Sequence, residues 1–88
     1  MTTIKHENIV NEPMGNKPVG KLPGVGPTLS GRMVHGGYEK ASQIYGQYLV
    51  LNRDHVRFEN WMKDNFRADR RHAGNCSKAL EEYYTHFN

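Results

Sequence analysis

The sequence predicts an all-α domain of five helices, and three observations support this prediction. Apolar residues recur at spacings of three, four and seven, as on one face of a helix, and no stretch alternates as a half-buried strand does. Glycine and proline pairs separate these stretches at short intervals, which is typical of turns between helices. The length of 88 residues suits one domain, so residues 1–88 are expected to fold as a single unit.

The first helix is expected to end at Val10. Thr2 and Thr3 carry hydroxyl groups that commonly cap a helix N-terminus, and residues 11–13, Asn-Glu-Pro, stop the helix. The stretch that follows, up to Gly20, is rich in proline and glycine, which indicates an ordered but irregular linker.

A Gly-Val-Gly turn between two short helical stretches gives residues 20–35 the layout of a helix-hairpin-helix. Gly24 and Gly26 are expected to allow a turn with positive φ, because neither carries a side chain. Val25 between them is expected to face the core. Pro27 suits the first turn of the following helix, where its missing N–H is not needed.

The start of this second hairpin helix is the expected phosphate site. The N–H groups of Gly24, Gly26 and Thr28 are expected to point outward there, and free donors at a helix N-terminus bind phosphate oxygens. Leu29 belongs to the same expected site, and the small Ser30 suits close packing between the hairpin helices. Because backbone amides contact phosphates and not base edges, the motif predicts sequence-independent binding of double-stranded DNA. A structural turn without a ligand is the alternative.

The middle of the chain predicts a helix from about Tyr38 to Leu51, after a stop at residues 36–37, Gly-Gly. Its expected buried face consists of Tyr38, Ala41, Tyr45, Tyr48 and Leu49. Gly46 lies inside this helix, where glycine costs about 1 kcal/mol relative to alanine. A close approach by another backbone, such as a partner's helix, would explain this glycine, and an unoptimised surface position is the alternative.

Asp54 and Asp69 are expected to cap the last two helices. The apolar stripe of the first consists of Phe58, Trp61, Met62 and Phe66. The stripe of the second consists of Ala73, Cys76, Leu80, Tyr83, Tyr84 and Phe87. Both stripes are interpreted as core.

The formal net charge of +3 permits nucleic-acid binding without proving it. Arg70 and Arg71 follow the capping Asp69, so a helix dipole, free amides and two guanidinium groups are expected to converge on an anion there. Lys5 and Arg32 are expected to add positive charge to the same interface.

The composition argues against several other classes of protein. Cys76 is the only cysteine, which excludes an intrachain disulfide and a four-cysteine zinc site and fits a reducing compartment. The five histidines are scattered and no catalytic constellation is present, so neither a metal, another cofactor nor an enzyme is expected. No apolar run approaches the roughly 20 residues that span a membrane.

Over residues 1–88 the chain also resembles the barrier-to-autointegration factor family, small chromatin proteins of animals, with almost no gaps. The most specific stretches are Met1-Thr2-Thr3, Lys5-His6, Glu12-Pro13-Met14-Gly15, Lys17-Pro18-Val19-Gly20, Gly24-Val25-Gly26 and Gly46-Gln47-Tyr48-Leu49-Val50-Leu51. Further matches are Lys40-Ala41, Phe58, Trp61, Lys63-Asp64, Leu80 and Phe87.

The resemblance implies a helical homodimer with one DNA site per subunit, the two sites facing apart, so that the dimer bridges and compacts DNA. It also implies binding to LEM-domain proteins of the inner nuclear membrane, to lamins and to histones. The implied location is the nucleus, at the nuclear envelope and on chromatin, and also the cytoplasm. Thr2 and Thr3 resemble sites whose phosphorylation releases DNA, because negative charge beside Lys5 repels a phosphate backbone.

Three sets of residues follow from the motifs and the resemblance. The DNA site would comprise Lys5, Gly24, Val25, Gly26, Thr28, Leu29, Arg32, Arg70 and Arg71. The dimer interface would comprise Gly46, Leu49, Val50 and Arg57. The groove for LEM-domain proteins would comprise Tyr38, Ala41, Tyr45, Val50 and Leu51.

Several residues depart from the family's usual pattern. Basic residues of the family are replaced by Glu7, Gly31, Gly36, Asn52 and Gly74, and Arg70 offsets part of this loss. Arg57 stands in place of a leucine beside the dimer seam, where an unpaired buried charge costs several kcal/mol. These departures keep a second hypothesis open: a protein-interaction adaptor, or the heterodimer partner of a sibling paralogue, with weakened DNA binding.

Overall fold

The computed structural model describes residues 4–87, and within them the chain forms five α-helices and one short 3-10 helix. They are α1 (Ile4–Val10), η1 (Val19–Lys21), α2 (Pro27–His35), α3 (Ala41–Val50), α4 (His55–Phe66) and α5 (Arg70–Phe87). Over the same residues no strand forms, and an isolated antiparallel bridge joins Pro18 to Lys40. The prediction of an all-α fold with five helices is confirmed. No helix in this range is long and apolar enough to cross a membrane.

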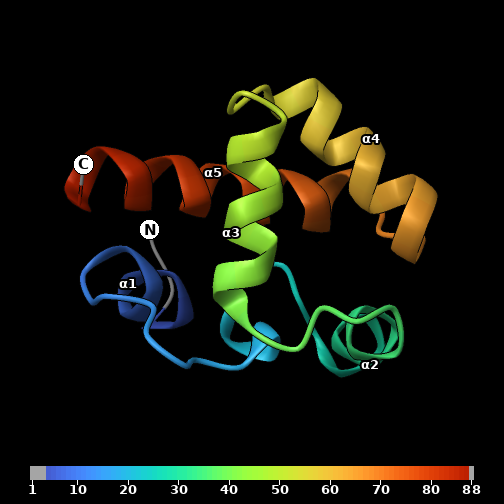
Figure 1. The fold of residues 1–88 in the computed structure, drawn as a ribbon, viewed down its shortest axis with the longest axis horizontal. Helices are drawn as coiled ribbons and strands as arrows, with labels where there is room; N and C mark the ends of the chain where they lie inside the picture. The colour runs from blue at the N-terminus through green and yellow to red at the C-terminus, as the bar shows by residue number, and fades with distance from the viewer. Residues whose placement is uncertain (1–3, 88) are drawn as a thin grey trace.

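The longest helix, α5, is the platform on which the others are arranged (Figure 1). α1 and α4 pack against α5, and α3 crosses it. η1 packs against both α2 and α3, and α2 also contacts α4. This arrangement brings the hairpin segment, η1 and α2, next to the junction between α4 and α5.

The core takes side chains from all of these elements, and the predicted stripes supply much of it. Its largest fully buried side chains are Tyr48, Phe58, Ile9, Leu22, Met33, Ile44, Met62 and Leu80. Along α5 the stripe is buried at Ala73 and Cys76, becomes half-buried at Tyr83, and is exposed at Phe87. The stripe of the last helix is therefore core only in its first three turns.

The start of α3 was predicted too early. Tyr38 lies outside the helix, which begins at Ala41 after the N-cap residue Lys40. The Gln43 Oε1 atom accepts the N–H groups of Glu39 and Lys40 at 2.8 and 2.9 Å, so these two donors are satisfied by a side chain and not by a further helical turn. The Tyr38 ring instead packs edge-on against the aromatic rings of α4.

Both predicted aspartate caps are confirmed. The Asp54 Oδ1 atom accepts the N–H of Arg57 at 3.0 Å, and the Asp69 Oδ1 atom accepts the N–H of His72 at 2.8 Å. Each bond satisfies one of the backbone donors that the first helical turn leaves unpaired. The predicted caps of the first helix, Thr2 and Thr3, lie outside the described residues.

Glu81 on α5 ties down the turn between α3 and α4. Its carboxylate accepts the Tyr48 hydroxyl at 2.7 Å and the Arg53 Nε and Nη2 atoms at 3.0 and 2.6 Å. The Arg53 guanidinium also lies 3.7 Å from the centroid of the Tyr84 ring. Two hydrogen bonds lower the pKa of Glu81 to about 2: the bond from Arg53 has the larger effect and the bond from Tyr48 the smaller. Burial, followed by the bond to Glu81, raises the pKa of Tyr48.

Candidate nucleic-acid interface

The predicted hairpin, residues 20–35, corresponds to η1, a turn and α2. Val25 in the turn is 1% exposed, so its predicted inward orientation is confirmed, and its N–H donates to the Leu22 carbonyl at 3.1 Å. The Ser30 N–H donates to the Gly26 carbonyl at 2.8 Å, which closes the first turn of α2. A Cβ on Gly20 would lie 3.5 Å from the Ser30 Oγ atom, so the two helical segments pack closely where the sequence has these small residues.

Only one of the two turn glycines has the backbone conformation that favours glycine. Gly24 has φ of +80°, as predicted, whereas Gly26 has φ of −88° and ψ of −177°, which any residue adopts. The prediction of positive φ is therefore wrong for Gly26. A Cβ on Gly24 would also clash with the backbone carbonyl oxygen of His72, while open space surrounds Gly26. The two positions thus differ in how much substitution they tolerate.

Three backbone donors at the start of α2 are available to a ligand. Among the hydrogen bonds within residues 4–87, none uses the N–H of Gly24, Gly26 or Thr28. Gly26 and Thr28 are exposed and Gly24 is half-buried. Unpaired N–H groups at a helix N-terminus carry partial positive charge, so an anion that reaches them is stabilised by hydrogen bonds and by the helix dipole.

These donors open into a hollow of about 250 Å³ between the hairpin and the α4–α5 junction. The hairpin side consists of Gly24, Gly26, Pro27, Thr28, Leu29 and Arg32. The opposite side consists of Arg67, Ala68, Asp69 and His72. We call this space the hairpin hollow. It combines free backbone donors with two guanidinium groups, a combination that suits a phosphate oxygen.

Lys5 reaches the hairpin from α1. Its Nζ atom donates to the Val25 carbonyl at 2.6 Å, across 20 residues of sequence. Partial burial, together with the nearby charge of Lys21, lowers the pKa of Lys5, and Cys76 opposes this shift. The predicted site residue therefore lies at the turn, where it both holds the loop and contributes positive charge.

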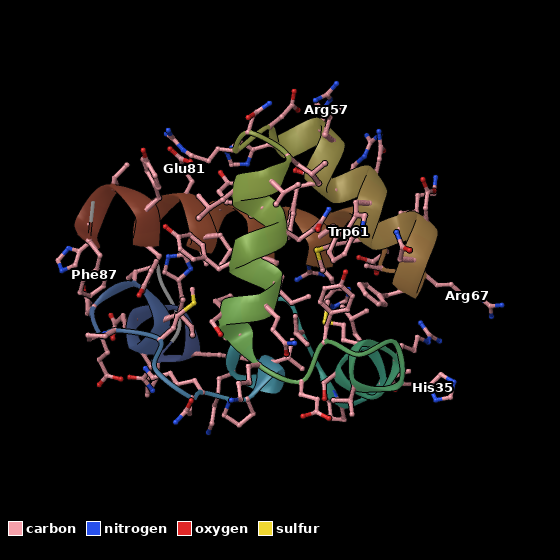
Figure 2. All side chains as sticks on the ribbon, in the orientation of Figure 1. His35, Arg57, Trp61, Arg67, Glu81 and Phe87 are labelled. Carbon is pink, nitrogen blue, oxygen red and sulfur yellow. The ribbon has the colours of Figure 1, made fainter. Side chains whose placement is uncertain are left out.

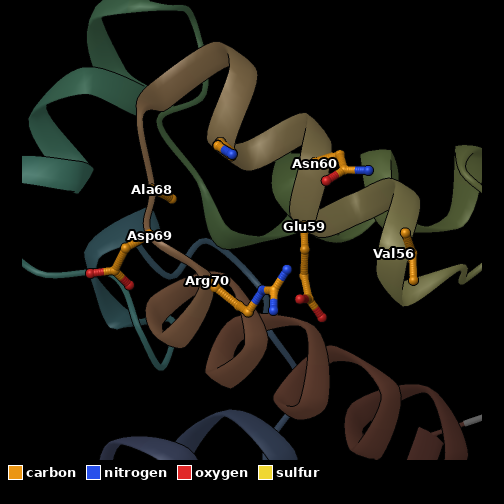
Figure 3. A pocket seen from close by; sticks show the side chains of 7 residues that line it. Val56, Glu59, Asn60, Ala68, Asp69 and Arg70 are labelled. Atoms are coloured by element: carbon orange, nitrogen blue, oxygen red, sulfur yellow. The ribbon is translucent and has the colours of Figure 1, made fainter.

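The three predicted arginines do not all meet at one place. Arg32 lines the hairpin hollow, and its Nη1 atom donates to the Phe66 carbonyl at 3.2 Å. Arg70 lines a different hollow, of about 550 Å³, between α4 and α5, and its side chain extends toward α4 beside Glu59 (Figure 3). Arg71 is exposed and lines neither space. The structure therefore separates Arg70 from the free amides of the hairpin.

The sequence did not predict the three ionisable residues on the far side of the hairpin hollow: Arg67, Asp69 as a lining carboxylate, and His72. The Asp69 Oδ1 atom accepts from the His72 Nδ1 atom at 2.8 Å in addition to the backbone N–H. These two bonds lower the pKa of Asp69, and the bond from the backbone N–H has the larger effect. The sequence predicts Asp69 only as a helix cap, and no sequence signal places the end of α4 beside the hairpin.

Of the residues expected at the dimer interface, Leu49, Val50 and Arg57 are exposed, and Gly46, inside α3, is half-buried. Leu49 is 40% exposed, so the prediction that it lies on the buried face of its helix is wrong. Val50 and, on α4, Val56 are 73% and 69% exposed. A Cβ on Gly46 would meet open space, and the exposed Arg57 side chain extends away from the body of the protein (Figure 2). Nothing within the described part of this single chain requires glycine at position 46.

The residues expected in the groove for LEM-domain proteins are less uniform. Ala41 is fully buried, while Tyr38, Tyr45 and Leu51 are half-buried against the core. Val50 alone of these five is exposed within the described chain. The two tyrosines and Leu51 therefore reach the surface only with part of their side chains, and Ala41 does not reach it.

No group of three or more histidine, cysteine, aspartate or glutamate side chains within residues 4–87 is placed to hold a metal ion. Cys76 is fully buried, and this burial raises the pKa of its thiol to about 12.

Comparison with known proteins adds an independent observation. Residues 1–87 match the family model described as barrier to autointegration factor. The barrier-to-autointegration factor of Drosophila melanogaster is 43% identical over 86 residues, which cover 98% of this chain and 96% of the relative. The Mus musculus protein of that name is 43% identical over 82 residues, covering 93% and 92%. Barrier-to-autointegration factor 1 of Caenorhabditis elegans is 36% identical over 86 residues, covering 98% and 97%.

Proposed function

This chain belongs to the barrier-to-autointegration factor family, and we propose that it binds double-stranded DNA without sequence preference and bridges it as a dimer. In this proposal it is a non-enzymatic chromatin protein of the nucleus, in which residues 1–88 form one domain and residues 20–35 its helix-hairpin-helix. The single observation that carries the proposal is the set of free N–H groups of Gly24, Gly26 and Thr28 in a hollow edged by arginines.

Several features support phosphate over other anions or base edges as the ligand. The three donors belong to the backbone, so they suit a repeating anion and cannot distinguish one base from another. Lys5, Arg32 and Arg67 add positive charge at or beside the hollow, and Arg71 is available on the exposed start of α5. The expected contribution of Arg70 is weaker than its position in the sequence indicates, because its side chain extends toward α4.

Bridging requires two such sites, and the exposed surface around Gly46, Leu49, Val50 and Arg57 supports self-association. Exposed aliphatic side chains on neighbouring turns gain free energy when they are buried against a second copy. Open space at Gly46 would let a partner's helix approach closely. Each subunit of the dimer would then present one hairpin hollow.

Further partners are part of the proposal through the family. They are LEM-domain proteins of the inner nuclear membrane at the surface near Tyr38, Tyr45, Val50 and Leu51, together with lamins and histones. This role would place the protein at the nuclear envelope and on chromatin, with a second population in the cytoplasm. Phosphorylation at Thr2 and Thr3 would release DNA by adding negative charge next to α1 and Lys5.

One observation favours a second candidate, a protein adaptor or a mixed-dimer partner with weak DNA binding. The Asp69 carboxylate lines the hairpin hollow and repels phosphate unless a neighbouring cation offsets it. The His72 Nδ1 atom lies 2.8 Å from this carboxylate and can donate a hydrogen bond to it. The two candidates therefore differ in the affinity of the chain for DNA.

The deciding experiment is fluorescence anisotropy of two unrelated duplexes titrated at several salt concentrations. We expect equal affinity for both duplexes and a log–log salt slope of about −0.9 for each phosphate neutralised. Gly26→Glu places a negative charge among the donors without a clash, so it should abolish binding, whereas Gly26→Gln, of nearly equal size, should retain most of it. Binding by Gly26→Glu at the strength of the unmodified chain would contradict the proposal and favour the adaptor.

A further inference from the structure

A second hollow, of about 490 Å³, adjoins the hairpin hollow between α2 and the end of α4. It is lined by Thr28, Gly31, Arg32, His35, Asn65, Phe66 and Arg67. Thr28, Arg32 and Arg67 also line the hairpin hollow, so the two spaces share one rim. A polymeric ligand bound at the hairpin amides would extend over this rim into the second hollow.

The charges around the second hollow have one sign. Its lining includes two arginines and one histidine and no carboxylate. Within residues 4–87 the ion pairs involve neither Arg32 nor Arg67. Arg32 is oriented by its bond to the Phe66 carbonyl, which leaves its remaining N–H groups available. The space therefore attracts an anion and has donors that can bind one.

Arg67 is the residue that defines this hollow, and its backbone is unusual for an arginine. It is the C-cap of α4, with φ of +60° and ψ of +31°, in the left-handed region that favours glycine at the end of a helix. Its exposed side chain extends from the end of α4 on the same side of the protein as His35 (Figure 2). The chain thus has a strained cation at a position where glycine would be easier to accommodate.

We infer that Arg67, with Arg32 and His35, forms a second DNA-phosphate subsite next to the hairpin hollow. The subsite takes a backbone phosphate adjoining the one held by the hairpin amides. This inference rests on the proposed function, because it extends the same interface by one contact. In this arrangement the positive charges of Arg32 and Arg67, which line both hollows, offset the negative charge of Asp69 in the hairpin hollow.

The test compares Arg67→Gly with Arg67→Lys by anisotropy over a salt series, using one duplex. Glycine suits the left-handed backbone, so Arg67→Gly should fold normally and unfold at an equal or higher temperature. It should weaken DNA binding about threefold to tenfold near 0.1 M salt and make the log–log salt slope shallower by about 0.9. Arg67→Lys retains the charge and should retain the slope.

Gly26→Glu, measured in parallel, separates this inference from the proposed function. If Gly26→Glu abolishes binding and Arg67→Gly leaves affinity and slope unchanged, the second subsite is overturned alone. If neither variant changes binding, the proposed function is overturned with it. A shallower slope in Arg67→Gly but not in Arg67→Lys, with an unchanged molecular mass in solution, supports the subsite.

Discussion

Gly24 in the hairpin turn lies so close to His72 on α5 that a Cβ on Gly24 would overlap the backbone carbonyl oxygen of His72. The same Cβ would lie 3.3 Å from the Cβ of Asn75. The hairpin is therefore packed backbone to backbone against α5, and this contact holds the unpaired hairpin amides opposite the residues at the start of that helix.

This contact predicts that the two turn glycines differ in their effect on stability. Gly24→Ala should lower the free energy of unfolding by about 2–4 kcal/mol, because it combines a backbone clash with strain at positive φ. Gly26→Ala should change it by less than about 0.5 kcal/mol. Urea denaturation followed by circular dichroism measures both values, and equal losses in the two variants would show that the hairpin does not pack on α5 in this way.

The Arg53–Glu81 pair predicts a loss of stability in acid. The pKa of Glu81 is lowered to about 2 in the folded chain, against about 4.3 for an unfolded glutamate. A lowered folded pKa contributes stability above pH 4.3, and that contribution disappears as the pH falls toward 2. Glu81→Gln should therefore lower the free energy of unfolding by about 1–2 kcal/mol at pH 7 and much less near pH 2.5.

The control for Glu81→Gln is Glu39→Gln, which changes an exposed acid outside the ion pairs of the described residues. The stability of this variant relative to the unmodified chain should be nearly the same at both pH values. If Glu81→Gln lowers the free energy of unfolding by the same amount at pH 2.5 as at pH 7, then lost packing, and not the charge of Glu81, causes the effect.

If the exposed surface at the end of α3 forms a dimer interface, one substitution there should abolish the dimer. Val50 is 73% exposed in the single chain, so Val50→Glu should leave the helical content unchanged and convert a dimer into a monomer. Light scattering coupled to size exclusion measures the mass. Val34→Glu, at an exposed valine on α2, is the matched control and should keep the dimer. A dimeric mass for Val50→Glu would place the interface elsewhere.

Replacement of Arg57 by leucine is predicted to strengthen self-association. Its side chain is exposed in the single chain and would lose water contacts when a second copy covers this surface. Arg57→Leu should therefore tighten self-association about tenfold in sedimentation analysis, because it removes a desolvated charge and adds apolar contact. Lys63→Leu, on the last turn of α4, should have no such effect. Weaker association of Arg57→Leu would mean that Arg57 pairs with an acid on the second copy.

Cys76 is predicted to be unreactive in the folded chain. It is fully buried, and its pKa is raised to about 12, so almost no thiolate forms at pH 8. Labelling with a thiol-specific chromogenic reagent should be slow in buffer and rapid in urea. Immediate stoichiometric labelling in buffer would contradict the burial of this side chain.

Patterns that depend on residues close in sequence were predicted well. The five helices and the caps at Asp54 and Asp69 follow from local spacing and hydrogen bonding, and both caps are present. The error at Tyr38 has a local and a long-range cause. The Gln43 side chain makes the helix start later, and the Tyr38 ring packs on Trp61 of α4, 23 residues away. The spacing of apolar residues does not reveal that the Gln43 side chain accepts the N–H groups of Glu39 and Lys40.

The sequence by itself determined the all-α fold and the position of the hairpin turn, because each depends on residues that are neighbours along the chain. It also determined the family, because that rests on matching residues and needs no knowledge of how the helices pack. The tertiary structure decided which charges share a site. It placed Arg67 and His72 beside the hairpin, directed Arg70 toward α4 and brought Lys5 to Val25 across 20 residues. The physical reason is that burial of the apolar stripes sets how the helices cross. The exposed charged residues follow the helices that carry them.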